Sequence, residues 1–356
     1  MWETSVIWAV RQIFSSVFAL RPIDFSIYLS LAFLFGIAAQ FRAMDGDSFL
    51  KSLISLFERR LGVLYAVVLV TSIFSPIILN DVVILILTPV LVKYAKQFNV
   101  DIAPLLVTEI CFTNITSSLT PFGNPQNLLM WQASGISASR FVLGTWLPLA
   151  VSGVLTAAAL YHFRRKEGGA REFSAPIPAR PPFIYLVAVG LTVFILPTLG
   201  LAGVLTLGVA FLLGFPFTFR SPGRLVKEFD YRGLLILWWL IATITLLAAL
   251  VQPILVQFVS PAVAGNQPYS ALFVGLTSNL ISNVPTTQLI LGTIAIPQRA
   301  APMLAVEAGL AGNITPIASF ANILALLMVR RGGLPIRKTI LLQVGVGLVS
   351  FLPAFL

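Results

Sequence analysis

The sequence predicts an all-α polytopic membrane protein with about 8–10 spanning helices, arranged as two inverted-topology repeats. Each repeat is expected to contain a re-entrant hairpin and a broken transmembrane helix. Three observations predict this architecture. The chain of 356 residues is 58% hydrophobic and only 10% charged, with a mean hydropathy of +0.94. Polar, proline-containing interruptions recur in the same order in its two halves, and basic residues gather in short segments between apolar runs.

The composition argues against a soluble enzyme and against a nucleic-acid-binding protein. A soluble domain carries charge on about a quarter of its residues. The net charge of +10 is distributed over the short segments between apolar runs, which is the pattern that orients membrane helices rather than a nucleic-acid-binding patch. The single cysteine, Cys111, excludes an internal disulfide and a multi-cysteine metal site, and His162 is the only histidine. We therefore expect no enzymatic activity, no metal and no cofactor other than a coupling ion, Na⁺ or H⁺.

Three landmarks recur at nearly constant spacing, which indicates an internal duplication. The offsets are 206, 203 and 195 residues. The matched landmarks are Asp24 and Asp230, each opening an apolar run; Ser75–Pro89 and Asn279–Thr293; and Thr120–Leu129 and Thr315–Leu324.

The duplication divides the chain into two units joined by a basic segment. The N-terminal repeat is expected at 1–163, with a hairpin at 61–97 and a broken helix at 102–131. A basic linker covers 164–180. The C-terminal repeat is expected at 181–356, with a hairpin at 268–297 and a broken helix at 302–328.

The basic segments predict the orientation, because lysine and arginine are enriched on the cytoplasmic side. This rule places the central linker in the cytoplasm and the C-terminus outside the plasma (inner) membrane. The hairpin 61–97 is bounded by basic residues and the hairpin 268–297 is not, so the two should enter from opposite sides. Residues 4–20 form either a first span or an interfacial helix. The amphipathic segments 47–60 and 221–230 are expected to lie at the cytoplasmic interface.

The stretch TPFGNPQNLLM places two prolines and a glycine inside an otherwise apolar segment. Proline removes a backbone donor and glycine permits a close backbone approach, so the helix should open here. Within a membrane, such a break is tolerated only inside protein or beside a water-filled cavity. Asn124 and Asn127 could serve either the opened backbone or a ligand. The break recurs at Thr315, Ser319 and Asn322, and the hairpins have polar tips at Asn80-Asp81 and at 282–287.

Three carboxylates are expected inside the membrane, where a charge is expensive and usually functional. Asp81 lies at a hairpin tip and is the first candidate for proton or cation coupling. Glu109 and Glu307 lie near the start of the segments that lead to each break, and for these a structural and a coupling role both remain open.

The motifs TNITSSLTPFGNPQNLLMW, NDVVILILTP, SNVPTTQLIL and GNITPIASFANILAL resemble the ion transporter superfamily, in its arsenite/antimonite permease and Na⁺/H⁺ antiporter D branch. The resemblance implies an inverted-repeat transporter, often a homodimer, with an ATPase partner only in an arsenite-type system. One tip reads Leu79-Asn80-Asp81 where the dicarboxylate branch has Ser-Asn-Thr, which argues against a tight carboxylate site. The candidate substrate and ion ligands are Asn80, Asp81, Thr120, Asn124, Asn127, Ser282, Asn283, Thr286, Thr287, Thr315, Ser319 and Asn322.

Two functions fit these features. The first is a secondary transporter of a small anion, an oxyanion or a weak-acid species such as arsenite, coupled to H⁺ or Na⁺. Its substrate would bind where hairpin tips meet broken helices, and its partners would be lipid and the transported ion, with no nucleic acid. The alternative is a Na⁺/H⁺ antiporter that uses Asp81 and the other buried acids.

Overall fold

The computed structural model describes residues 25–164, 180–198, 203–219, 222–236, 238–239, 242–243, 267–293 and 296–356. Within these ranges the chain is almost entirely helical and contains no strand, which confirms the predicted all-α class. The predictions for residues 4–20 and for nearly all of the linker 164–180 lie outside the described residues.

The helices of the two halves follow one another with short connections. The first half contains α2 (Phe25–Ala43), α3 (Gly46–Leu61), α4 (Val63–Ile78), α5 (Asn80–Phe98), α6 (Ile102–Ser117), α7 (Pro125–Ser134) and α8 (Ala138–Arg164). The second contains α9 (Arg180–Thr198), α10 (Gly203–Leu212), α11 (Phe215–Thr218), α12 (Pro222–Glu228), α14 (Gln267–Ile281), α15 (Asn283–Thr293), α16 (Ala301–Ala311), η1 (Pro316–Ala318), α17 (Phe320–Arg331), α18 (Arg337–Phe351) and η2 (Leu352–Phe355).

Two helix pairs are each interrupted by a single residue with a left-handed backbone. Leu79 separates α4 from α5 with a φ of 73°, and Ser282 separates α14 from α15 with a φ of 74°. A positive φ is unfavourable for residues with a β-carbon, and such strain persists only where the surrounding structure enforces it. Both residues lie at the tips that the sequence predicts for its hairpins.

The first pair folds back on itself. Tyr94, near the end of α5, donates a hydrogen bond to the Glu58 carboxylate in the last turn of α3, directly before α4 begins. The beginning of α4 and the end of α5 therefore lie at the same end of the pair. If α5 had continued the direction of α4, these ends would be separated by about 50 Å. The re-entrant character of the pair with respect to a membrane stays a prediction.

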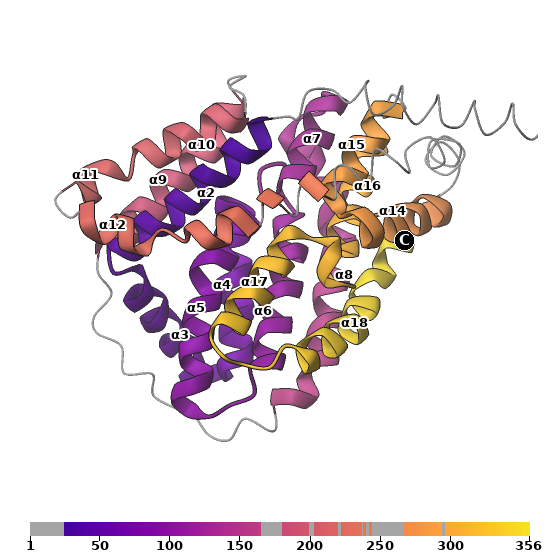
Figure 1. Cartoon of the computed structure of the whole chain (residues 1–356). Coiled ribbons are helices and arrows are strands. Elements are labelled where there is room, and N and C mark those ends of the chain that lie inside the picture. Colours follow the sequence, from indigo (N-terminus) through magenta and orange to yellow (C-terminus); the bar gives the residue numbers. More distant parts are fainter. Residues whose placement is uncertain are drawn as a thin grey trace, which may run out of the picture.

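The two broken helices lie at the centre of the fold. The first ends at Ser117 in α6 and resumes at Pro125 in α7; the second ends at Ala311 in α16 and resumes at Phe320 in α17. Helices from the two halves interleave around these breaks. α17 packs against α5, and α7 packs against α15 and α16. Figure 1 shows α6 and α17 in the middle, α8 and α18 beside each other, and α2, α9 and α10 as a group at the other side.

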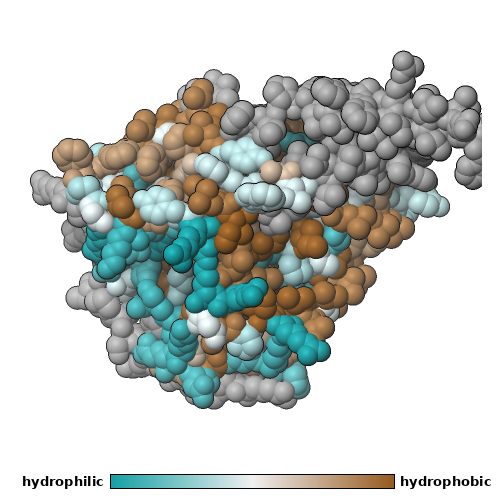
Figure 2. Space-filling model, in the orientation of Figure 1, coloured by the Kyte–Doolittle hydropathy of each residue, from teal (hydrophilic) through white to brown (hydrophobic). Residues whose placement is uncertain are grey.

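The outer helices expose long apolar side chains in stripes. On α14, Leu272, Leu276 and Leu280 recur every fourth residue and are 50%, 66% and 69% exposed. Comparable stripes lie on α8, α9 and α18. Figure 2 shows apolar surface around α14 and around α10 and α11, while hydrophilic residues gather towards the lower left. Among the described residues, two helices, Ala138–Phe163 and Arg337–Phe355, are long and apolar enough to cross a membrane by themselves.

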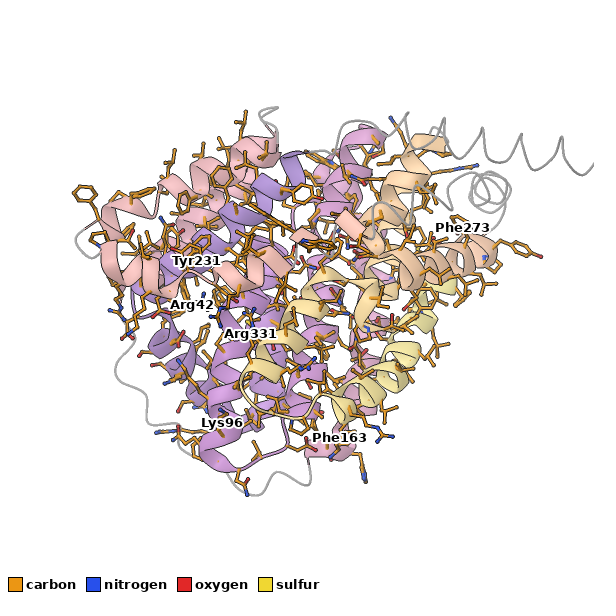
Figure 3. The ribbon with its side chains drawn as sticks, in the orientation of Figure 1. Arg42, Lys96, Phe163, Tyr231, Phe273 and Arg331 are labelled. Carbon is orange, nitrogen blue, oxygen red and sulfur yellow. The ribbon has the colours of Figure 1, made fainter. Side chains whose placement is uncertain are left out.

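Basic residues from separate segments pair with acids from other helices at one side of the molecule. In Figure 3, Arg42 and Arg331 lie close to Tyr231, and Lys96 lies further down near the lower edge. Exposed pairs of this kind contribute about 0–1 kcal/mol each, so they mark a polar face more than they hold the fold together. The pairs are Arg42 with Glu228, Lys93 with Asp47, Arg224 with Asp45, Arg331 with Asp230, and Lys338 with Asp101.

Candidate functional site

The tip of the first helix pair is bonded to the first helix break. The backbone N–H of Asn80 donates to the carbonyl oxygen of Gly123 over 2.8 Å. The Thr120 hydroxyl donates to the carbonyl oxygen of Pro76 in α4, over 2.7 Å. Glycine is required at 123, because a β-carbon there would lie 2.0 Å from the carbonyl oxygen of Ser117. The tip thus satisfies one of the carbonyls that the break opens.

Two asparagine side chains form hydrogen bonds with groups of the first break itself. Asn124 is the N-cap of α7, with its Oδ1 atom accepting from the Asn127 backbone N–H over 2.9 Å and its Nδ2 atom donating to the Ser117 hydroxyl over 3.1 Å. Asn127 donates through Nδ2 to the carbonyl oxygens of Ser118 and Thr120, over 3.1 and 2.8 Å, with a longer contact to that of Ser117. These bonds satisfy backbone groups that hydrocarbon cannot solvate.

The second tip and break make corresponding contacts, with side-chain groups in place of two of the backbone groups. The Ser282 hydroxyl donates to the carbonyl oxygen of Ala318, 195 residues after Gly123. Thr315 donates to Oδ1 of Asn279, 203 residues after Pro76, over 2.8 Å. Asn322, 195 residues after Asn127, donates to the carbonyl oxygens of Gly312 and Thr315 over 2.5 and 3.2 Å. The two tip-and-break units therefore share one local plan; their inverted orientation stays a prediction.

A chain of three amides joins the two units. Asn80 donates through Nδ2 to Oδ1 of Asn114 over 3.4 Å, and Asn114 donates through its own Nδ2 to Oδ1 of Asn322 over 3.2 Å. All three side chains are buried. Asn114 lies in the last turn of α6 and was not among the predicted site residues. Its position in the motif TNIT, directly before the break, was the available signal.

Asp81 lies in the first turn of α5 and is 7% exposed. Its backbone N–H donates to Oδ1 of Asn80. Its carboxylate has no hydrogen bond or ion pair with the part of the chain that the structure describes. Of the three predicted coupling acids, Asp81 is the one placed at a tip.

Glu109 and Glu307 bond to hydroxyls away from the tips. The Thr88 hydroxyl lies 2.9 and 3.0 Å from the two carboxylate oxygens of Glu109, and the Ser270 hydroxyl donates to Oε1 of Glu307 over 2.7 Å. Thr88 comes seven residues after Asp81 in α5, a distance of about 10 Å along the helix. The structure does not bring these two acids into the amide chain.

The remaining predicted residues lie around the second tip. Thr286 donates to the Ser282 carbonyl over 2.9 Å, and Asn283 accepts from the Ser282 hydroxyl over 3.4 Å. The Thr287 hydroxyl is buried with no partner among the described residues. Ser319 is the N-cap of α17, and its carbonyl oxygen, not its side chain, accepts from the Asn322 N–H.

The comparisons with known proteins agree with this architecture. A family model described as "Citrate transporter" (CitMHS) matches residues 4–311. The inner membrane protein YbiR of Escherichia coli is 30% identical over 273 residues, covering 76% of this chain and 70% of its own. The transporter MJ0456 of Methanocaldococcus jannaschii is 27% identical over 278 residues, 77% of this chain and 72% of its own. The silicon efflux transporter LSI3 of rice (Oryza sativa subsp. japonica) is 34% identical over 107 residues, 29% of this chain and 22% of its own.

These matches confirm the predicted superfamily and a membrane-embedded transporter rather than an enzyme. The match covers the first tip, the first break and the second tip, and it ends at residue 311, directly before the second break. The chain therefore belongs to the citrate transporter family of the ion transporter superfamily.

Proposed function

We propose that the protein is a secondary transporter of a small anion, oxyanion or weak acid, coupled to H⁺ or Na⁺, with its substrate bound between the two tips and the two breaks. The observation that carries the proposal is the convergence of helix ends at this place. Four helices, α5, α7, α15 and α17, begin there, and four others, α4, α6, α14 and α16, end there. The Asn80–Asn114–Asn322 chain ties these ends together.

The site combines N-terminal and C-terminal ends of helices, and this combination suits one anion and one cation. The beginnings of helices carry partial positive charge and unpaired N–H groups, which favour an anion. The ends carry partial negative charge and free carbonyls, which favour Na⁺ or another cation. No lysine, arginine or histidine is buried within the described ranges, so dipoles and amides would hold the anion there.

An unpaired acceptor favours a substrate that carries hydrogen-bond donors. Oδ1 of Asn322 accepts from Asn114, but Oδ1 of the equivalent Asn127 is buried without a partner among the described residues. The position equivalent to Asn114 is Gly309, which has no side chain. A protonated oxyanion or a weak-acid hydroxide offers the missing donor, whereas a fully ionised carboxylate does not. The similarity to a silicon efflux transporter supports this class, and the family description supports an organic anion.

The second candidate is a Na⁺/H⁺ antiporter. The observation that favours it is that the three acids expected inside the membrane, Asp81, Glu109 and Glu307, are buried, while no basic side chain is buried among the described residues. Such acids inside a membrane usually bind a proton or a cation.

Transport by purified protein in liposomes separates the two candidates. Under the first proposal, an imposed Na⁺ or proton gradient drives uptake of an added anion, arsenite or silicic acid, and without substrate the gradients remain uncoupled. Proton movement driven by a Na⁺ gradient with no substrate present would instead support the antiporter.

The matched variants are Asp81→Asn and Asp45→Asn. Asp45 is an exposed aspartate with a left-handed backbone that asparagine tolerates, so its substitution should leave coupled flux unchanged. Asp81→Asn should abolish gradient-driven flux while the protein still elutes as a folded species. Undiminished coupled flux in Asp81→Asn would exclude Asp81 as the coupling group.

A further inference from the structure

One face of α18 carries buried polar side chains inside an otherwise apolar interface. Thr339, Gln343 and Ser350 are fully buried and recur at intervals of four and seven residues, so they lie on one side of the helix. This helix packs against α6 and α8, and the three run together in Figure 1. The cluster that fills the interface includes Val107, Cys111, Leu160 and Val346.

We call the interface of α18 with α6 and α8 the seam. Several polar side-chain atoms in it have no hydrogen-bond partner among the described residues. Gln343 is buried with neither its amide nitrogen nor its amide oxygen hydrogen-bonded to any described residue. The hydroxyls of Thr339 and of Thr156, on the facing helix α8, are likewise buried and unpaired among those residues. An amide contributes two donors and two acceptor sites, so a dry seam would leave at least one complete amide unsatisfied in a low-dielectric interior.

The seam has two defined ends. At one end, Lys338 pairs with Asp101 at the beginning of α6, on the charged side of the molecule. At the other end, Ser350 accepts from Asn313 over 2.6 Å, and Ser152 of α8 donates to the Ser350 carbonyl over 2.7 Å. Asn313 directly follows Gly312, the residue whose carbonyl accepts from Asn322 in the second break. The distance along α18 from Thr339 to Ser350 is about 17 Å.

We propose that water molecules occupy this seam and form a hydrated path from the charged side at Lys338 to the back of the second break at Asn313. Buried waters in proteins typically bind polar groups that have no protein partner, and they need two to four such partners each. Gln343 supplies both donors and acceptors in the middle of the path, and the hydroxyls of Thr339 and Thr156 continue it. The path reaches the second break without passing either hairpin tip, and it does not depend on which substrate the tips bind.

Silver ion accessibility tests the path, because Ag⁺ is small, soluble in water and reacts with thiolates. The chain has one cysteine, so Cys111→Ala provides the background. Single cysteines replace Gln343 and two controls, namely Val67, a fully buried apolar residue of α4 outside the seam, and Leu341, which is 66% exposed. The Gln343→Cys thiol should react at least about 10-fold faster than both controls, because thiolate forms only where water enters. A rate equal to that of Val67→Cys would overturn the proposal.

Wild-type protein gives a second readout that does not depend on the folding of a variant. Hydroxyl radicals generated from bound water by X-rays oxidise the side chains beside that water. Val346 and Val67 are both buried valines, at 4% and 0% exposure; Val346 lies on the polar face of α18, and Val67 lies in α4, outside the seam. Oxidation of Val346 should exceed that of Val67 several-fold, and equal oxidation of the two would show a dry seam.

Discussion

Removal of the Asn114 side chain tests whether the amide chain between the two units is a structural connection. In Asn114→Ala, Oδ1 of Asn322 and Nδ2 of Asn80 both lose a hydrogen-bond partner inside the protein. Hydrogen bonds between membrane helices contribute about 0.6 kcal/mol on average and up to about 1.7 kcal/mol. Two lost bonds, at 3.4 and 3.2 Å, therefore give an expected destabilisation of about 1–3 kcal/mol, measured by denaturant titration in mixed micelles.

The matched control is the preceding residue. Thr113 is buried in the same helix turn, and its hydroxyl has no partner among the described residues. Thr113→Val removes that hydroxyl at nearly constant volume and should leave the free energy of unfolding unchanged or slightly higher. Equal destabilisation by Asn114→Ala and Thr113→Val would refute the amide chain.

A double-mutant cycle isolates the bond that crosses between the units. Asn114→Ala and Asn322→Ala are combined, because Asn322 also caps its own break and its single variant loses several contacts. The coupling energy should fall at about 0.6–1.7 kcal/mol. A value within roughly 0.3 kcal/mol of zero would show that the two side chains do not interact.

Three further tests each follow from a single contact, and two of them include a matched control variant. Gly123→Ala should strongly destabilise the protein, because its β-carbon would lie 2.0 Å from the last carbonyl oxygen of α6. A β-carbon at Gly345 would meet no atom within 4 Å, so Gly345→Ala should stabilise the protein by about 0.5–1 kcal/mol. Thermal unfolding measures both variants. Thr88→Val leaves buried Glu109 without its hydroxyl donor and should lower the free energy of unfolding by about 1–3 kcal/mol in denaturant titrations. Thr88→Ser keeps the hydroxyl and should lower the free energy of unfolding much less. Lys338→Ala breaks an exposed ion pair and should change stability by less than about 1 kcal/mol at any salt concentration.

The sequence predicted those features that depend on local chemistry. Pro121, Gly123 and Pro125 disfavour a continuous helix whatever surrounds them, so the first break could be placed to within a few residues. The apolar runs likewise exceed any length that a loop would have, which is why helix positions followed from hydropathy. The repeated spacing of Thr120 and Thr315 predicted that they occupy equivalent places, and their hydroxyls do bond to equivalent helix pairs.

The partners of polar residues could not be predicted in the same way. The sequence places Glu109 near the first break, but the rotation of α6 about its axis decides that it faces Thr88 rather than a tip. Asn114 bonds to a residue 208 positions away, and no local pattern specifies such a pair. Both outcomes depend on helix packing, which is set by the whole interface rather than by the residues concerned.

The hydrogen bonds of the site differ in what their loss would cost, and this difference indicates where the two units can separate. The first tip is bonded to its break through backbone groups, from the Asn80 N–H to the Gly123 carbonyl. Breaking that bond inside a membrane would leave two backbone groups unsatisfied, at several kcal/mol each. Between the units, the amide chain through Asn114 uses side chains only, and each such bond contributes about 0.6 kcal/mol. Side-chain amides can also exchange protein partners for a ligand or water as the units move, which backbone groups fixed in a break cannot do. By this comparison, a conformational change that keeps the first tip with its own break and rearranges the amides around Asn114 costs less than one that separates the first tip from its break.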